Sequence, residues 1–121
     1  ILYVGGNDLS LGYSENKINE LFKSLLNQIR IKFPNCTIFS ISIKPSKHRI
    51  DKMNSIKTLN RIMKNELVKT PKSAFINIFD KFIDKNGNII SKYFLIDRLH
   101  LSQSGYDIWA DEVRKSLNSS L

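Results

Sequence analysis

The sequence CTIFSIS occupies residues 36–42 and predicts a β-strand, because it is apolar and rich in β-branched residues. Ahead of it, apolar residues recur at steps of three and four from Ile18 to Phe33, which is typical of an amphipathic helix with one buried face. Ser14 is suited to cap that helix, and Pro34 ends it. A strand that follows such a helix indicates an α/β fold.

The same alternation of strand and helix runs through the whole chain. The predicted elements are strands at 1–4, 36–42 and 73–79, helices at 14–33, 51–68 and 102–117, loops at 5–13 and 43–50, and a turn at 84–88. This order predicts a parallel sheet with helices on its faces, in which ligands bind beyond the carboxyl ends of the strands. We expect residues 1–121 to form one domain or part of one.

Two finer expectations concern burial. The run Ile1 to Val4 is continuously apolar, so we expect a strand covered on both faces. In the last helix we expect Tyr106, Trp109 and Val113 on the buried face, where they pack instead of stacking on a ligand.

Composition excludes several classes of protein. Hydrophobic residues make up 41% and charged residues 25% of the 121, which is ordinary for a globular fold and unlike a disordered chain. The single cysteine, Cys36, rules out an intramolecular disulfide framework, and we interpret it as a packed thiol. No apolar run approaches the roughly 18–20 residues that a transmembrane helix needs.

The net charge of +8 is concentrated in one segment. Residues 43–72 contain nine Lys or Arg and two acidic residues, which gives +7 for this segment alone. Such a charge can attract nucleic acid, but Lys dominates and few aromatic residues are interleaved for base stacking. We therefore favour a solvated helix face and expect no nucleic-acid partner. His48 in this segment is expected to be exposed, with no metal site around it.

Two short clusters could carry chemistry. The first, Gly5-Gly6-Asn7-Asp8, follows the first predicted strand and taken alone is a glycine-rich turn. The second is Asp97-Arg98-Leu99-His100, followed by Leu101-Ser102 and Gly105-Tyr106. A carboxylate three residues before a histidine can orient the ring, as in the Asp–His half of a catalytic triad, although such a pair alone is a weak signal.

Together, in this order, the clusters resemble the SGNH (GDSL-like) hydrolase superfamily, in its bacterial esterase and lipase branch. Residues 5–8 match the G-x-N-D block of that family, and residues 97–106 match its D-x-x-H-L-x-x-x-G-Y block. The segment from Ile41 to Arg49 is also similar. The resemblance implies a three-layer α/β/α sandwich with a parallel, flavodoxin-like sheet.

The resemblance also implies roles for single residues. His100 would be the general base, Asp97 would hold its tautomer, and Asn7 would donate to the oxyanion hole. Gly5 and Asp8 would support that loop. Ser46 and Arg49 are candidates for lining a substrate cleft, because their loop follows the end of a strand. No metal or organic cofactor is implied.

Three departures from the family pattern matter. The G-D-S block with the nucleophilic serine is absent, and so is the block with the second oxyanion-hole glycine. We therefore expect these residues to be the C-terminal part of an SGNH domain whose N-terminal strands are missing. This part is expected to be catalytically inactive by itself. A missing N-terminal segment or a second chain would be needed to cover the open edge of its first strand. The third departure is Arg98, where the family often has Gly; we expect its side chain to point to solvent.

The resemblance implies that the full-length protein hydrolyses a small carboxylic ester, with an acetyl or short acyl group. The alternative is a non-catalytic relative that keeps the fold and binds a ligand or partner.

Overall fold

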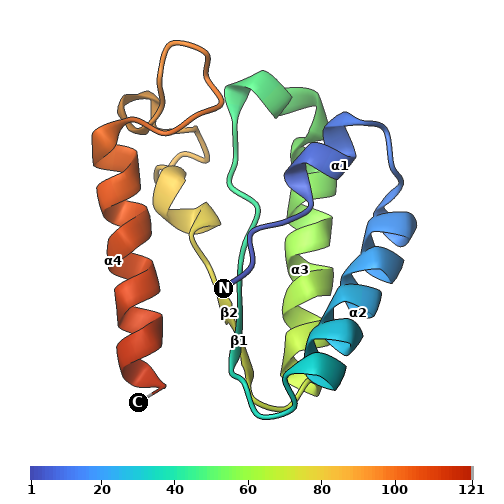
Figure 1. Ribbon diagram of the computed structural model, residues 1–121. Helices are drawn as coiled ribbons and strands as arrows, with labels where there is room; N and C mark the ends of the chain where they lie inside the picture. The colour runs from blue at the N-terminus through green and yellow to red at the C-terminus, as the bar shows by residue number, and fades with distance from the viewer. Residues whose placement is uncertain (121) are drawn as a thin grey trace.

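A computed structural model describes residues 1–120, and a small parallel sheet lies at its centre (Figure 1). Strand β1, Ile38–Ile41, pairs in parallel with β2, Ser73–Ile76, in a register that runs from Ile38 opposite Ser73 to Ile41 opposite Ile76. On the other side of β1, Leu2 forms a single parallel bridge to Ser40. The strand with the most β-branched sequence is therefore the central one.

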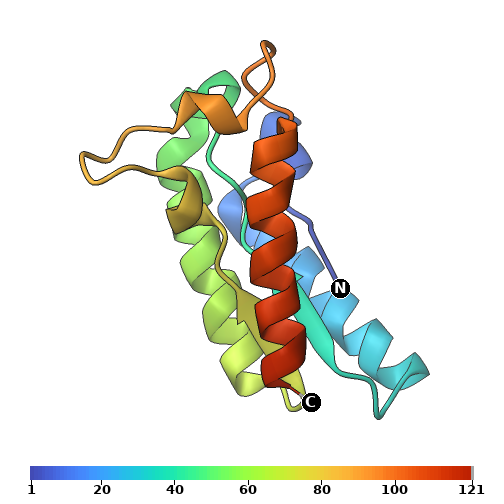
Figure 2. The same cartoon turned by 90° about the vertical axis from the view of Figure 1, so that its left-hand side faces the viewer.

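Helices cover both faces of this sheet (Figures 1 and 2). Helices α2, Glu15–Lys32, and α3, Met53–Lys69, lie on one face, and α4, Gln103–Ser119, lies on the other. Successive side chains of β1 alternate between two apolar clusters, so that Ile38 packs with α2 and α3 while Phe39 packs with residues of α4. The predicted three-layer α/β/α sandwich with a parallel sheet is confirmed.

The helix starts follow the predicted capping chemistry. The Ser14 hydroxyl accepts the backbone N–H of Lys17 at 3.1 Å, and the Ser102 hydroxyl accepts that of Gly105 at 3.3 Å. A Cβ on Gly105 would collide with the carbonyl oxygen of Tyr93, so glycine lets α4 approach the short 3₁₀ helix η3, Ser91–Tyr93. Among residues 1–120, no helix combines the length and the apolar character that crossing a bilayer requires.

The N-terminal expectations need correction. Residues 1–4 form one bridge and no continuous strand, and Ile1 is 64% exposed, because the described residues place no strand beyond this segment. The predicted loop at 5–13 contains the short helix α1, Gly6–Ser10, whose Leu9 N–H donates to the Gly5 carbonyl oxygen at 3.1 Å. Short polar helices of this kind carry no periodic apolar pattern.

Other differences concern burial and length. The expected polar loop at 43–50 is buried from Ile43 to Ser46 and then forms the 3₁₀ helix η1, Lys47–Lys52. The strands are shorter than predicted, four residues each. Tyr106, expected on the buried face of α4, is 53% exposed, whereas Trp109 and Val113 pack against the sheet as expected.

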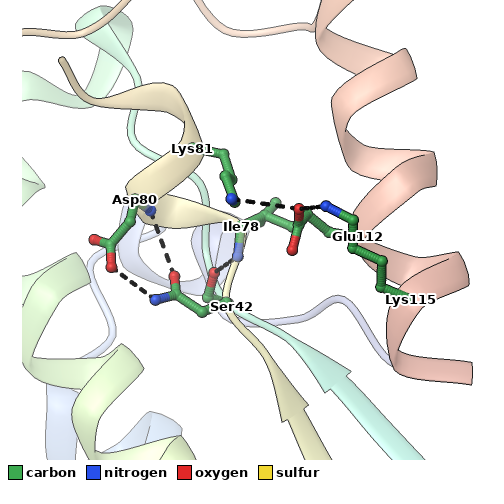
Figure 3. A network of polar contacts seen from close by, with 7 residues as sticks. Ser42, Ile78, Asp80, Lys81, Glu112 and Lys115 are labelled. Carbon is green, nitrogen blue, oxygen red and sulfur yellow. Dashed lines mark hydrogen bonds and ion pairs between the residues drawn. The ribbon is translucent and has the colours of Figure 1, made fainter. Parts of the chain in front are cut away.

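Hydrogen bonds at the strand ends tie the layers together (Figure 3). Directly after β1, the Ser42 hydroxyl accepts the backbone N–H groups of Ile78 at 2.9 Å and Phe79 at 3.0 Å, where the chain enters the 3₁₀ helix η2, Phe79–Phe82. From η2, the Lys81 ammonium lies 3.5 Å from a carboxylate oxygen of Glu112 on α4. The ends of both strands are thereby fixed relative to α4.

A buried amide fixes the chain after β1 to α3. Asn60 accepts the backbone N–H of Ile43 at 2.7 Å and donates to the carbonyl oxygen of the same residue at 2.9 Å. Ile43 is fully buried, so its backbone groups have no water to bond if the amide is removed.

We predict that Asn60→Ala lowers the free energy of unfolding by about 3 kcal/mol, because two buried backbone groups lose their partner. Denaturant unfolding followed by circular dichroism measures this loss. The matched control is Asn65→Ala, at an exposed position of the same helix. Equal effects of the two changes would contradict the role of Asn60.

Candidate active site

Three segments that are far apart in sequence meet at the carboxyl edge of the sheet (Figure 1). They are α1 after the first extended segment, η1 after β1, and the loop that precedes α4. Together they line a cavity of about 540 Å³. Of the residues singled out in the sequence, Gly5, Asn7, Asp8, Arg49 and His100 all lie in its wall.

Asp97 and His100 form a local pair on the loop before α4. The Asp97 Oδ2 atom lies 2.5 Å from Nδ1 of His100, while Oδ1 accepts the backbone N–H groups of Leu99 at 2.9 Å and His100 at 3.0 Å. The bond from the His100 side chain, followed by the two backbone bonds, lowers the pKa of Asp97 to about 2. The carboxylate thus stays charged in weak acid, and Nε2 is the ring nitrogen left for chemistry.

Arg49 holds the Asn7 side chain in one orientation. Its Nη2 atom donates to Asn7 Oδ1 at 2.8 Å. Because a guanidinium only donates hydrogen bonds, the oxygen of the amide must face it, and the NH₂ group is left to donate elsewhere. Arg49 therefore acts on the cavity through Asn7, a role that sequence reasoning did not give it.

Glycines make this arrangement sterically feasible. A Cβ on Gly6 would come within 2.6 Å of Nη1 of Arg49, so the guanidinium crosses α1 only because this residue is glycine. Gly5 has φ 111°, which side chains rarely adopt, and a Cβ there would lie 2.9 Å from the Ile43 side chain. No role was predicted for Gly6 from the sequence, although a glycine next to Asn7 could have indicated a close contact there.

Ser46 supports the loop of the Asp–His pair and does not line the cavity. It is buried, and its hydroxyl donates to the carbonyl oxygen of Arg98 at 2.9 Å. The backbone N–H of His48 donates to the same oxygen at 3.3 Å. Of the two candidates for the cleft, only Arg49 is in the wall.

Aromatic residues and a lysine complete the wall. The ring of Tyr3 meets that of Trp109 edge-on at 4.7 Å, and the Lys44 ammonium lies over the Tyr3 ring at 5.6 Å. Tyr106 also borders the cavity. Burial, and next to it the charge of Arg49, lower the pKa of Lys44 to about 8, against an opposite effect of Asp97. None of these wall positions was predicted as part of the site.

Arg98 departs from the family pattern at a strained position. Its side chain is exposed, as expected, but its φ of 60° lies in the left-handed region that favours glycine. The departure therefore affects the backbone of the Asp97–His100 loop more than the cavity.

Other candidate residues lie outside the cavity. His48 is exposed, and Cys36 is a half-buried thiol that packs at the edge of the core. Over residues 1–120, the side chains of His, Cys, Asp and Glu form no group of three that could hold a metal ion. In the same part of the chain, the cavity wall contains no Ser, Thr or Cys.

The comparisons with known proteins rest on structure. No family model matches the chain, and no curated protein matches its sequence. The solved structures that it matches include a GDSL-like lipase from Bacteroides thetaiotaomicron, with TM-score 0.79 and 21% identity over 98% of this chain and 61% of that one. The chain has the fold of the GDSL-like hydrolases.

Two further solved structures match the chain. They are the esterase domain of the ORF1 protein of the zebrafish ZfL2-1 retrotransposon, with TM-score 0.76 and 23% identity, and a family 3 carbohydrate esterase from Clostridium thermocellum, with TM-score 0.68 and 28% identity. Both matches cover 98% of this chain, and 67% and 55% of those chains, respectively. The chain thus spans about half to two thirds of these three solved structures.

We predict that His100→Ala raises the pKa of Asp97 from about 2 toward its ordinary value of 3.8, because the strongest bond to the carboxylate is lost. The rise is partial, since both backbone N–H donors remain. A carbon-13 NMR titration of the Asp97 carboxyl measures it, with His48→Ala as the control.

Because folding depresses the pKa of Asp97, the Asp97–His100 pair stabilises the fold above roughly pH 4, and that contribution is lost as the pH falls toward 2.

We predict that Arg98→Gly raises the free energy of unfolding by about 0.5–1 kcal/mol, because relief of the left-handed backbone outweighs the greater freedom of glycine in the unfolded chain. Thermal or denaturant unfolding measures the change. Arg98→Ala removes the same charge but keeps the Cβ, and so should bring no such gain. A gain with alanine would show that the charge, and not the backbone, is responsible.

Proposed function

We propose that this chain carries the base and one oxyanion donor of a serine ester hydrolase. The observation that carries the proposal is that His100, backed by Asp97, and the oriented amide of Asn7 share one cavity wall at the carboxyl edge of the sheet. The GDSL-like fold, shared with proteins described as lipases and esterases, supports the same class of reaction.

In this proposal the nucleophilic serine comes from a segment outside these 121 residues. His100 Nε2 would take the proton of that serine as its oxygen attacks the ester carbonyl carbon. Asp97 would keep the other proton on Nδ1 and stabilise the imidazolium that forms. The imidazolium would then protonate the leaving alcohol. A water molecule, deprotonated by His100 in turn, would attack the acyl-enzyme. The bond to the serine oxygen would then break, the serine would take the proton back from His100, and the acid would be released.

Asn7 would stabilise the negative oxygen of the tetrahedral intermediate. With Oδ1 held by Arg49, its NH₂ group is free to donate to that oxygen. A preorganised donor of this kind typically lowers the barrier by roughly 2.7–4 kcal/mol. Arg49 would be a positioning residue in this step, because it acts through the amide.

The proposed substrate is a small carboxylic ester, such as an acetyl or short-acyl ester. A cavity of about 540 Å³ is of the size that small-molecule ligands occupy. The proposal includes no cofactor and no nucleic-acid partner.

The alternative is a non-catalytic domain that binds a ligand in the same cavity. The wall that residues 1–120 provide contains no nucleophilic hydroxyl or thiol of Ser, Thr or Cys, which favours this alternative if no serine-bearing segment exists.

The test uses the natural gene product that contains this chain. We predict that it hydrolyses 4-nitrophenyl acetate and reacts with a fluorophosphonate probe at a serine outside the present sequence. His100→Ala should lower kcat by at least about a thousandfold, and Asn7→Ala by about a hundredfold, because they remove the base and one oxyanion donor.

His48→Ala is the matched control, since this exposed histidine lies outside the cavity wall and should leave the rate unchanged. A protein that is neither labelled nor active, yet binds small ligands in the cavity, would support the non-catalytic alternative. Full activity in the His100→Ala variant would refute the assignment of the base.

A further inference from the structure

Two buried cations line the candidate active site. Lys44 and Arg49 are each only 9% exposed, and both stand in the cavity wall. Within the described part of the chain, no Asp or Glu carboxylate lies within ion-pair distance of either. The Nε atom of Arg49 is buried there without a hydrogen-bond partner. Two largely buried positive charges thus lack an ion-pair partner, although the charge of Asp97 acts on Lys44 from farther away.

These two residues differ from the rest of the basic segment. Residues 43–72 contain seven further cations, of which Lys52 is half-buried and the other six are exposed. The six exposed cations fit the expected solvated face, where water hydrates their charges. Lys44 and Arg49 instead turn inward from the segment after β1, toward Tyr3 and Asn7, respectively.

The local electrostatics favour an anion at this place. Desolvating an unpaired charge is costly, and burial and the Arg49 charge together lower the pKa of Lys44 to about 8. The Tyr3 ring beneath the ammonium carries no net charge, and Asp8 is the acidic side chain in the wall. An oxyanion in the cavity would accept hydrogen bonds from the Lys44 ammonium and bring the missing negative charge.

We propose that Lys44 and Arg49 form a binding site for an oxyanion group, such as a carboxylate, phosphate or sulfate, beside His100 in the cavity. The inference that this group belongs to the substrate, an ester that also carries a negative charge, rests on the proposed function. The oxyanion site itself does not. A separate negative group on the substrate would also hold the ester in a fixed direction relative to His100.

The first experiment measures binding without chemistry. Inorganic sulfate is titrated into the natural gene product and followed by ¹⁵N NMR, against chloride at matched ionic strength. The expected result is saturable shifts of the backbone amides of residues 5–8 and 44–49. Lys44→Met should weaken sulfate binding about tenfold, because a charge-assisted hydrogen bond is lost.

The control is Lys64→Met, which removes an exposed cation of α3 from the same basic segment and should leave sulfate binding unchanged. Lys44→Arg restores the charge and should restore binding. Without sulfate, Lys44→Met should melt a few degrees higher than the unchanged protein, because a buried unpaired charge is gone. Equal weakening by Lys44→Met and Lys64→Met, or no saturable effect of sulfate, would overturn the proposal.

The second experiment tests the substrate inference. The natural gene product is given 4-acetoxybenzoate and the neutral 4-acetoxybenzamide, which release the same acyl group from similar phenols. The expected result is a kcat/KM about tenfold higher for the carboxylate, and Lys44→Met should remove that preference, chiefly by raising KM for the carboxylate. Equal kcat/KM values would overturn the anionic substrate but leave the esterase. Sulfate binding with hydrolysis of neither ester would support the oxyanion site and contradict the proposed function.

Discussion

The parallel direction of the extended segments is the constraint on which the rest of the structure depends. Leu2 and β2 flank β1 on its two sides, and all three run the same way. Their carboxyl ends therefore lie at the same edge of the sheet. The segment after Leu2 and the segment after β1 must both begin at that edge. Asn7 and Arg49 lie in the short helices that follow these ends, and this geometry allows their contact at 2.8 Å. An antiparallel pairing would have sent the two residues to opposite edges.

The segment after β1 supports both halves of the candidate site. Through Arg49 it orients the Asn7 amide, and through the hydroxyl of Ser46 it holds the loop that bears Asp97 and His100. Asn60 of α3 in turn fixes the start of this segment at both backbone groups of Ile43. The side-chain geometry around the cavity is thereby built on a few polar contacts in the interior, which satisfy polar groups of a segment that was expected to be a polar loop.

Most of the fold, but less of the candidate site, could be predicted from the sequence. Helical spacing and the serines at positions 14 and 102 were sufficient to place the long helices, because those signals are local. The short helix α1 could not be predicted, since it depends on a Gly5 backbone with φ 111° and on the guanidinium that lies across Gly6. Asn7 and the Asp–His pair were predicted as site residues from the family motif. Lys44 was not, because the burial of a lysine is a property of tertiary packing and leaves no pattern in the sequence.

The two hydrogen-bonded pairs of the candidate site differ in sequence separation. The Asp97–His100 bond joins residues three apart, and the same carboxylate accepts two neighbouring backbone N–H groups. The Asn7–Arg49 bond joins residues 42 apart, so it carries a much larger entropy of loop closure. A local opening that separates α1 from η1 would free the amide while the histidine stays paired. The candidate base is thus a property of one loop, whereas the candidate oxyanion donor is a property of the assembled domain.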